Sequence, residues 1–340
     1  MISAMKTSFY LIILLVAMAV SSCKDPNAGC PADADILTSF VLETGESATI
    51  TKSGEAYSQD DAGCTFLVQY FTPGWEEVYV NTDTGRYVLT DDGDLFPVTN
   101  TFFDDVEAYA GFTDMMLTDI TQLDKNWNSF TLQSPMAPTV EAYVDLRACI
   151  MDNTCTFMDN RFDLVADPLN ATNQVLQCTA VPPSADMVTS KASIERSFNY
   201  FTEGDDLWYE ARYYIVSGMP YSLADFENRF FDQSPGPRIV IEGNKLAIEN
   251  KFEEKLTYYP DAAPDIPVGE WFTVKVHFRF STSDAGLIEL WQNNVLLMSV
   301  NGKNLPNGNS IQTSLEVGAT ATSDGCVLLI DDIKLSPTSF

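Results

Sequence analysis

The chain has 340 residues and a formal net charge of −29, from 48 acidic and 19 Lys or Arg side chains. So large a negative charge argues against binding to nucleic acid or to the anionic face of a membrane, since both are themselves negative. The hydrophobic content of 45% is sufficient for a core, and the length allows one large domain and a smaller one.

Residues 1–22 have the features of a signal peptide. Lys6 supplies a positive charge, and 9–20 is an apolar run that is too short for an ordinary transmembrane helix. The residues just before Cys23 resemble a bacterial lipobox, in which cleavage exposes the cysteine for lipidation. We therefore expect Cys23 to carry a lipid anchor, with a plain secretory signal as the alternative. Residues 23–34, rich in Pro, Gly, Asp and Ala, then form a tether.

The other cysteines are consistent with an exported chain, because disulfides persist in oxidising compartments. Six remain once Cys23 is set aside, enough for three disulfides whose pairing the sequence does not decide: Cys30, Cys64, Cys149, Cys155, Cys178 and Cys326. A zinc site is the competing interpretation. The chain has no close CxxC pair and a single histidine, so we expect no metal cluster of this kind.

From residue 35 to 138, short β-like runs alternate with turns. Thr65–Tyr70 and Glu76–Val80 are candidate strands, separated by a Thr-Pro-Gly turn signal. The segment 102–123 has mixed periodicity that fits either a helix or a long loop. We expect a small β-rich N-terminal region here.

From residue 139 to 340 the strand pattern is denser and more regular. The two-residue links Gly243-Asn244 and Asn293-Asn294 favour antiparallel hairpins over βαβ crossovers. Many strands with short turns and few helices predict an all-β sandwich or barrel. The candidate strands are 161–165, 173–177, 207–216, 238–242, 245–252, 271–280, 286–291, 295–300, 314–320 and 327–335.

The strand 271–280 alternates most cleanly. Its apolar residues share one side, which predicts burial against a second sheet, and its polar residues share the other. Because Lys and Arg are almost never buried without a partner, the polar side must face water, a groove or a ligand. This polar row comprises Thr273, Lys275, His277 and Arg279, and it includes the one histidine of the chain.

Four segments of this region carry familiar motifs: GEWFTVKVH at 269–277, GLIELWQNN at 286–294, LEVG at 315–318 and LIDDI at 329–333. They resemble the concanavalin A-like lectin/glucanase superfamily, and within it polysaccharide lyases of the heparin-lyase and glucuronan-lyase kind. The resemblance covers roughly 140–335. It implies an antiparallel two-sheet jelly-roll sandwich whose concave face holds a glycan. Lectins, lyases and inert domains share this fold, so the activity must be argued from the site.

Extending the alternation to neighbouring strands enlarges the polar row. One side of 207–216 carries Trp208, Glu210, Arg212 and Tyr214, and one side of 245–252 carries Lys251. If these sides join the row, aromatic rings can stack on sugars while Lys and Arg pair with uronate carboxylates. The predicted glycan-binding residues are Lys275, Arg279, Trp208, Glu210, Lys251 and Arg238.

A lyase for such glycans needs a cation for the carboxylate, a base for the C5 proton and an acid for the leaving oxygen. The predicted catalytic residues are Arg212 as the cation, with Arg238 or Arg279 as substitutes, His277 as the base and Tyr214 as the acid. Lyases of this fold commonly use an Arg, Gln, His and Tyr set, although the chain lacks their Gln-x-His motif. The alternative is a structural His277 that is hydrogen-bonded to a carboxylate, with Lys275 and Arg279 in cross-strand salt bridges to Glu249 or Glu289.

No cofactor is expected. The acidic clusters at 91–94 and at Asp331-Asp332 allow a structural calcium, but neither has EF-hand spacing and a solvated turn is the simpler interpretation. A paired-carboxylate glucanase is disfavoured because the chain lacks a Glu-x-Asp-x-x-Glu strand motif.

These patterns predict an exported lipoprotein, anchored at the outer membrane or cell surface, whose concanavalin A-like domain binds a polysaccharide. The first alternative is a polysaccharide lyase that cleaves uronate-containing glycans by β-elimination, and the second is a structural or adhesive surface protein. The expected partners are a polysaccharide, acidic in the lyase case, and a membrane through the lipid anchor, without nucleic acid. If the anchor is absent, we expect secretion.

Mass spectrometry of the mature N-terminus tests the lipid anchor. We expect a mature chain that begins at Cys23 with a mass increase equal to its acyl groups, and no such species for Cys23→Ala. Cleavage at another bond, or an unmodified Cys23 thiol, would contradict the lipobox interpretation.

Overall fold

The computed structural model describes two compact units, Met1–Val98 and Thr99–Phe340. The residues that it describes are 30, 36–41, 47–51, 55–60, 63–69, 77–82, 85–90, 95–97, 99–117, 125–197, 199–229, 235–252, 256–306 and 311–340. The expected signal peptide, the lipid site at Cys23, the tether apart from Cys30, and the acidic cluster at 91–94 lie outside them. Within these ranges no helix is long and apolar enough to cross a membrane.

The first unit consists of antiparallel strands. Its four-stranded sheet has the order β1-β2-β3-β4, with β1 Ile36–Val41, β2 Ser47–Thr51, β3 Glu55–Asp60 and β4 Gly63–Gln69. Its three-stranded sheet has the order β5-β6-β7, with β5 Glu77–Thr82, β6 Gly85–Thr90 and β7 Leu95–Pro97. The described residues of this unit are thus rich in strands, as expected, but the unit ends at Val98 rather than at residue 138.

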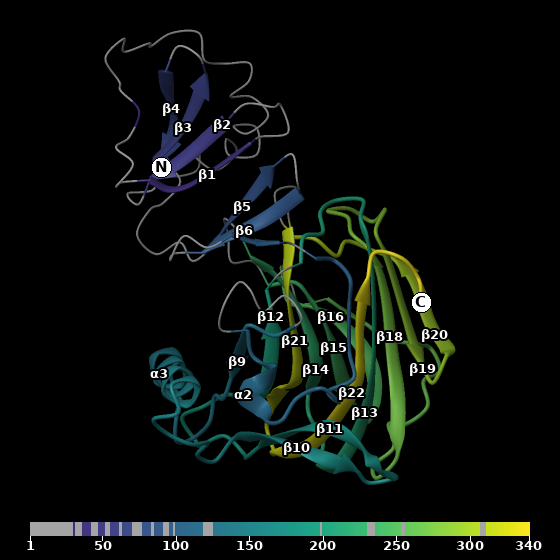
Figure 1. Ribbon diagram of the computed structural model, residues 1–340. Helices are drawn as coiled ribbons and strands as arrows, with labels where there is room; N and C mark the ends of the chain where they lie inside the picture. Colours follow the sequence, from purple (N-terminus) through teal and green to yellow (C-terminus); the bar gives the residue numbers. More distant parts are fainter. Residues whose placement is uncertain are drawn as a thin grey trace. The chain divides into compact units, whose positions relative to one another are not determined.

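The second unit is a sandwich of two antiparallel sheets, seen in the lower part of Figure 1. The eight-stranded sheet has the order β10 Arg161–Asp167, β11 Asn170–Ala180, β22 Cys326–Ser336, β13 Asp206–Gly218, β18 Trp271–Arg279, β19 Leu287–Gln292 and β20 Val295–Asn301, with β8 Phe102–Asp104 paired to β22. The seven-stranded sheet has the order β17 Thr257–Tyr258, β16 Lys245–Asn250, β15 Pro237–Glu242, β14 Ser222–Arg229, β21 Ile311–Thr322, β12 Ser190–Arg196 and β9 Ser129–Thr131. The predicted two-sheet sandwich is confirmed.

The core of the second unit is built by side-chain alternation on both sheets. Along β13, Leu207, Tyr209, Ala211 and Tyr213 are completely buried, and the residues between them remain partly accessible. The hydroxyl oxygens of Tyr209 and Tyr213 lie 2.5 Å apart, which satisfies both groups inside the apolar core. Burial raises the pKa of both phenols above the usual value of 10.

The two predicted hairpin links are present. Gly243 and Asn244 join β15 to β16, and Asn293 and Asn294 join β19 to β20. All four residues have φ between 51° and 65°, the left-handed region that two-residue type I′ turns require. Turn chemistry and strand alternation therefore agree in this part of the chain.

Residues 99–138, which sequence analysis placed in the N-terminal region, contribute strands to the sandwich. They supply β8 to one sheet, β9 to the other, and the short helix α2, Phe112–Met115. The buried Asp104 carboxylate holds this segment together by accepting hydrogen bonds from Tyr109 Oη at 2.9 Å and Trp127 Nε1 at 2.7 Å. Contacts between residues distant in sequence thus determine the structure of this segment, whose local sequence pattern is ambiguous.

The cysteines divide into paired and free groups. Cys149, near the end of α3 (Val140–Met151), forms a disulfide with Cys155, and Cys30 is also disulfide-bonded. Cys178 and Cys326 are free and buried, contrary to the expectation of three disulfides. They are diagonal neighbours on β11 and β22, because Cys178 lies opposite Leu328 rather than opposite Cys326. Diagonal Cα atoms are about 7–8 Å apart, which is longer than most disulfides allow.

Candidate functional site

The predicted polar row exists on the outer face of the eight-stranded sheet, but not all of its expected members belong to it. Trp208 lies opposite His277, and Glu210 lies opposite Lys275, so β13 and β18 share the face as predicted. Arg238 on β15 and Lys251 directly after β16 belong to the seven-stranded sheet. The expectation that they join Lys275 is therefore wrong, because alternation reveals a strand's two sides but not its sheet.

His277 is held by the protein on all sides. It is buried, with Nδ1 2.8 Å from Glu289 Oε2 and Nε2 2.7 Å from Asp206 Oδ1. Its ring stacks on Trp208 with centroids 3.9 Å apart. Arg279 also pairs with Asp206, at 3.1 Å. Both imidazole nitrogens are occupied, which matches the structural alternative for His277 rather than a base open to substrate.

Arg212 is likewise committed to carboxylates of the protein. Its Nη1 lies 3.1 Å from Asp331 and 3.1 Å from Asp332, and its guanidinium covers the ring of Trp271 at 4.5 Å. Burial, with Asp332 nearby, raises the pKa of the Asp331 carboxyl to about 6. Tyr214 packs edge-on against Trp271, with centroids 5.5 Å apart. Asp331 and Asp332 thus serve as partners for Arg212.

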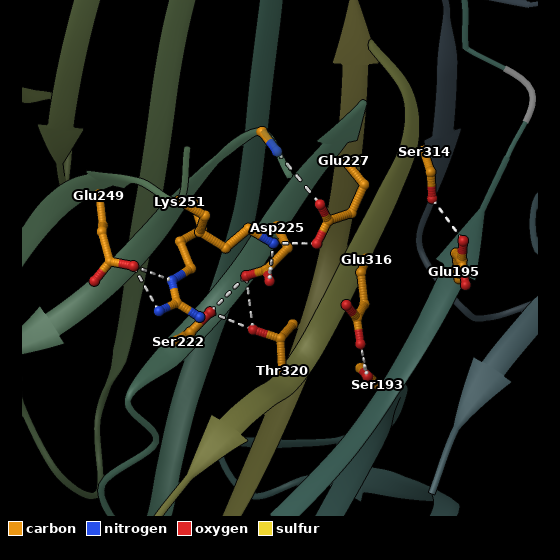
Figure 2. Close-up of polar contacts among 12 residues, drawn as sticks. Ser193, Glu195, Ser222, Asp225, Glu227, Glu249, Lys251, Ser314, Glu316 and Thr320 are labelled. Atoms are coloured by element: carbon orange, nitrogen blue, oxygen red, sulfur yellow. Dashed lines mark hydrogen bonds and ion pairs between the residues drawn. The ribbon is translucent and has the colours of Figure 1, made fainter. Parts of the chain in front are cut away.

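The seven-stranded sheet carries a second polar face, part of which is shown in Figure 2. The pairing register aligns one residue from each strand, in the order Thr257, Glu249, Arg238, Asp225, Glu316, Glu195 and Ser129. We call these seven residues the carboxylate row. Three of its acids, on β14, β21 and β12, lie directly opposite one another, an arrangement that destabilises a sheet unless other groups compensate.

The negative charge of the Asp225 carboxylate is compensated by cations and hydroxyl groups. Its carboxylate lies 2.8 Å from Lys251 Nζ and accepts hydrogen bonds from Ser222 Oγ at 2.6 Å and Thr320 Oγ1 at 2.9 Å. Burial alone would raise the pKa of this carboxyl. The charges of Lys251, Lys191 and Arg238 outweigh burial and hold the pKa of Asp225 well below its usual range.

Lys251 and Arg238 are tightly paired at the other end of the row. Lys251 Nζ also contacts Glu227, and Arg238 donates to Glu249 through Nε at 3.0 Å and Nη2 at 2.6 Å. Tyr221 Oη donates to Glu249 as well, at 2.5 Å. Carboxylate oxygens of Asp225, Glu227 and Glu316 lie within 4.8 Å of one another, a grouping that suits a cation. Lys251 supplies that positive charge here.

Glu316 is compensated less fully than Asp225. It is buried and lies opposite Asp225 on one side and Glu195 on the other. Ser193 Oγ donates to it, and Lys191 Nζ is 3.7 Å away. Burial, together with the charges of Asp225 and Glu195, raises the pKa of Glu316 to about 6 despite these two partners. The charge of Glu316 in turn raises the pKa of Lys191.

Sequence analysis missed this face because it did not recognise four of its seven strands, which are β9, β12, β14 and β17. The strands β12 and β14 are absent from the predicted set, and they supply Lys191, Ser193, Glu195, Asp225 and Glu227. A signal was nevertheless present, since polar and apolar residues alternate through 191–195 and 314–317.

The contacts of His277 predict a structural effect of its removal. His277→Ala leaves Asp206 and Glu289 without the imidazole and Trp208 without its stacking partner, so we expect a loss of roughly 1–3 kcal/mol in the free energy of unfolding. Urea denaturation measures it, with Arg279→Gln as a control on the same strand whose side chain is more exposed. A loss below about 0.5 kcal/mol would contradict the structural role.

The raised pKa of Glu316 predicts a pH dependence of stability. A carboxyl whose folded pKa lies above its unfolded value stabilises the fold at low pH, and this contribution is lost as the pH rises through about 6. Glu316→Gln removes the titration, so the stability of the variant relative to the wild type should increase between about pH 4 and pH 7. Thermal unfolding across this range measures the difference, with the exposed Glu270→Gln as control. A difference that is independent of pH would refute the assignment.

Comparisons with known proteins found solved structures that resemble this chain and one matching family model. A solved endo-β-1,4-glucuronan lyase from the fungus Trichoderma reesei is 12% identical, with a TM-score of 0.48, covering 71% of this chain and 96% of that chain. Alginate lyases from a Chlorella virus and from Pseudomonas aeruginosa are 7% and 14% identical, with TM-scores of 0.39 and 0.40. They cover 52% and 62% of this chain, and 89% and 97% of their own. No curated protein sequence matches. The family model described as polysaccharide lyase matches residues 156–334, more than half of the sequence, and the chain therefore belongs to the polysaccharide lyase family.

Proposed function

We propose that this protein cleaves a uronate-containing polysaccharide by β-elimination on the polar face of the seven-stranded sheet. Membership of the polysaccharide lyase family supports the reaction type. Elimination removes the proton on the carbon next to a carboxylate, so the substrate of such an enzyme contains a uronate. The observation that carries the proposal is the pair formed by Glu316, whose pKa is raised, and Lys191 beside it.

Lys191 is the cation of this face that is best placed to meet a substrate carboxylate. Its distance of 3.7 Å to Glu316 is longer than the pairing distances of Arg238 and Lys251, which are 2.6 and 2.8 Å. Its side chain is 26% exposed, compared with 15% and 13% for those two. Neutralising the substrate carboxylate makes the neighbouring C5 proton more acidic, and an ammonium group is suited to this task.

Glu316 has the properties of the base. With a pKa of about 6 it is ionised at neutral pH and still basic enough to accept a proton, which is the compromise that general bases require. The proton would pass from substrate C5 to a Glu316 oxygen, and the electron pair left on carbon would form the double bond as the glycosidic oxygen departs. Tyr143 on α3 interacts electrostatically with Lys191, and its hydroxyl is the proposed proton donor to that oxygen.

The remaining charges of the face keep this pair in position. Asp225 binds Lys251 and raises the pKa of Glu316, and it is itself fixed by Ser222 and Thr320. We therefore assign Asp225 a positioning role, since its carboxylate is buried and its contacts are within the protein.

Export is part of the same proposal. The signal-like segment 1–22 and Cys23 support a mature protein outside the cytoplasm, held by a lipid. The Cys149–Cys155 disulfide is also typical of an oxidising compartment. A polymer that is too large to enter a cell would then be cleaved outside it, where the protein is held.

A second candidate function is glycan binding without cleavage. It is favoured by the close pairing of Arg238 and Lys251 with carboxylates of their own sheet, which leaves these two cations less available to a substrate. Both candidate functions predict that the protein binds the polysaccharide, and only the lyase predicts turnover.

The ultraviolet absorbance of the unsaturated product distinguishes them. We expect the mature protein to release it from at least one of alginate, glucuronan and heparin, with a rate that rises as the pH passes through about 6. Glu316→Gln and Lys191→Met should each lower the rate by about 10²–10⁴-fold, since each removes a group that acts in the transition state.

The control is Lys245→Gln, which removes a charge at an exposed position at the start of β16. Binding of all three polymers without any product would support the binding function instead. Full activity of Glu316→Gln would rule out Glu316 as the base.

A further inference from the structure

A line of six side chains crosses the outer face of the eight-stranded sheet. The register aligns Phe103 on β8, Lys334 on β22, Glu210 on β13, Lys275 on β18, Trp291 on β19 and Leu296 on β20. We call these six residues the aromatic–lysine row. Neighbouring strands are about 4.8 Å apart, so the row extends over roughly 24 Å. That length suits an extended polymer better than a small molecule.

Lys275, at the centre of the row, is surrounded by aromatic rings. Its Nζ is 4.9 Å from the ring centroid of Trp208, 5.5 Å from that of Trp291 and 5.9 Å from that of Phe340. In the part of the chain that the structure describes, Lys275 forms no ion pair, although Glu210 lies directly opposite it. Glu210 instead binds Lys334, at 3.0 Å.

Lys275 differs in this respect from the other cations of the face. Arg212 pairs with Asp331 and Asp332, Arg279 pairs with Asp206, and Lys334 pairs with Glu210. The charge of Lys275 is thus available to an anion from outside the protein. An ammonium group held between indole rings and partly shielded from water binds a carboxylate more strongly than a freely solvated lysine does.

The ends of the row expose apolar surface. Phe103 is 51% exposed and Leu296 is 49% exposed, and Phe340 lies over both Lys275 and Lys334. Apolar side chains therefore flank three charged side chains along one line on an otherwise polar face. A polymer that matches this line has apolar faces and carries negative charges along its length.

From these observations we infer that the aromatic–lysine row is a second glycan-binding surface, which takes an acidic polysaccharide. Pyranose rings offer an apolar face to Trp291, Phe103 and Leu296, and a uronate carboxylate pairs with Lys275. The identity of the polymer as the substrate of the enzyme rests on the proposed function; the binding surface does not.

The position of the row gives it a distinct role. The outer faces of the two sheets point away from each other, because their inner faces share the core. The row and the carboxylate row therefore bind different stretches of a polymer. Holding one stretch raises the effective concentration of the neighbouring stretches at the other face, which increases retention without any new contact.

Affinity electrophoresis in gels that contain alginate tests the inference. All proteins carry Glu316→Gln, so that the polymer stays intact. Lys275→Gln should weaken binding about fivefold or more, the loss expected for one charge-assisted contact of about 1 kcal/mol. Lys245→Gln, an equal change of charge at an exposed position in the other sheet, should change binding less than about twofold.

A neutral β-glucan separates the contribution of charge from that of stacking. On this polymer Lys275→Gln should behave like Lys245→Gln, and Trp291→Leu should weaken binding to both polymers. Thermal unfolding confirms that each variant is folded. If Lys275→Gln and Lys245→Gln bind alginate equally, the second surface is refuted, whatever the rate measurements show about Glu316. If Lys275→Gln weakens binding while the enzyme shows no turnover, the surface stands and the proposed reaction fails.

Discussion

The polar face of the seven-stranded sheet depends on one electrostatic constraint, which is that three carboxylates on adjacent strands lie directly opposite one another. Asp225, Glu316 and Glu195 repel one another, and each is buried. The sheet can hold them because Lys251 and Lys191 approach from neighbouring positions and because hydroxyl groups donate to all three. Asp225 is compensated more fully than Glu316, and this difference separates the pKa values of the two carboxyls. The Asp225 carboxyl stays ionised and positions its neighbours, while the Glu316 carboxyl can exchange a proton near neutral pH.

The sandwich gives the two sheets different outer faces. On the seven-stranded sheet, charged groups shield one another, and acids such as Glu249 and Glu316 are buried. On the eight-stranded sheet, the alternating side chains of β13 remain partly exposed, and the histidine lies within a network of carboxylates and indoles. Proton transfer suits the first face, where a base is desolvated and its pKa is raised. Adhesion to a polymer suits the second, where Lys275 has no carboxylate partner among the residues that the structure describes and aromatic rings reach solvent.

Much of the fold was predictable from the chain itself. The hairpins at Gly243-Asn244 and Asn293-Asn294 have the left-handed backbone that their residues favour, and every predicted strand of the second unit is present. The strands β12 and β14 were missed, and with them Lys191 and Asp225. The partners that allow their polar residues to be buried come from strands that are distant in sequence, so the local pattern did not reveal them.

The sequence by itself determined the class of fold, the antiparallel pairing and the side of each strand that faces the core, since these follow from period-two alternation and turn chemistry within a few residues. Only the tertiary structure decided which strands share a sheet. It separated Arg238 and Lys251 from Lys275, surrounded His277 with two carboxylates, and aligned Glu316 with Asp225. The physical reason is that a side chain's charge state and partners depend on long-range pairing, which no local pattern encodes.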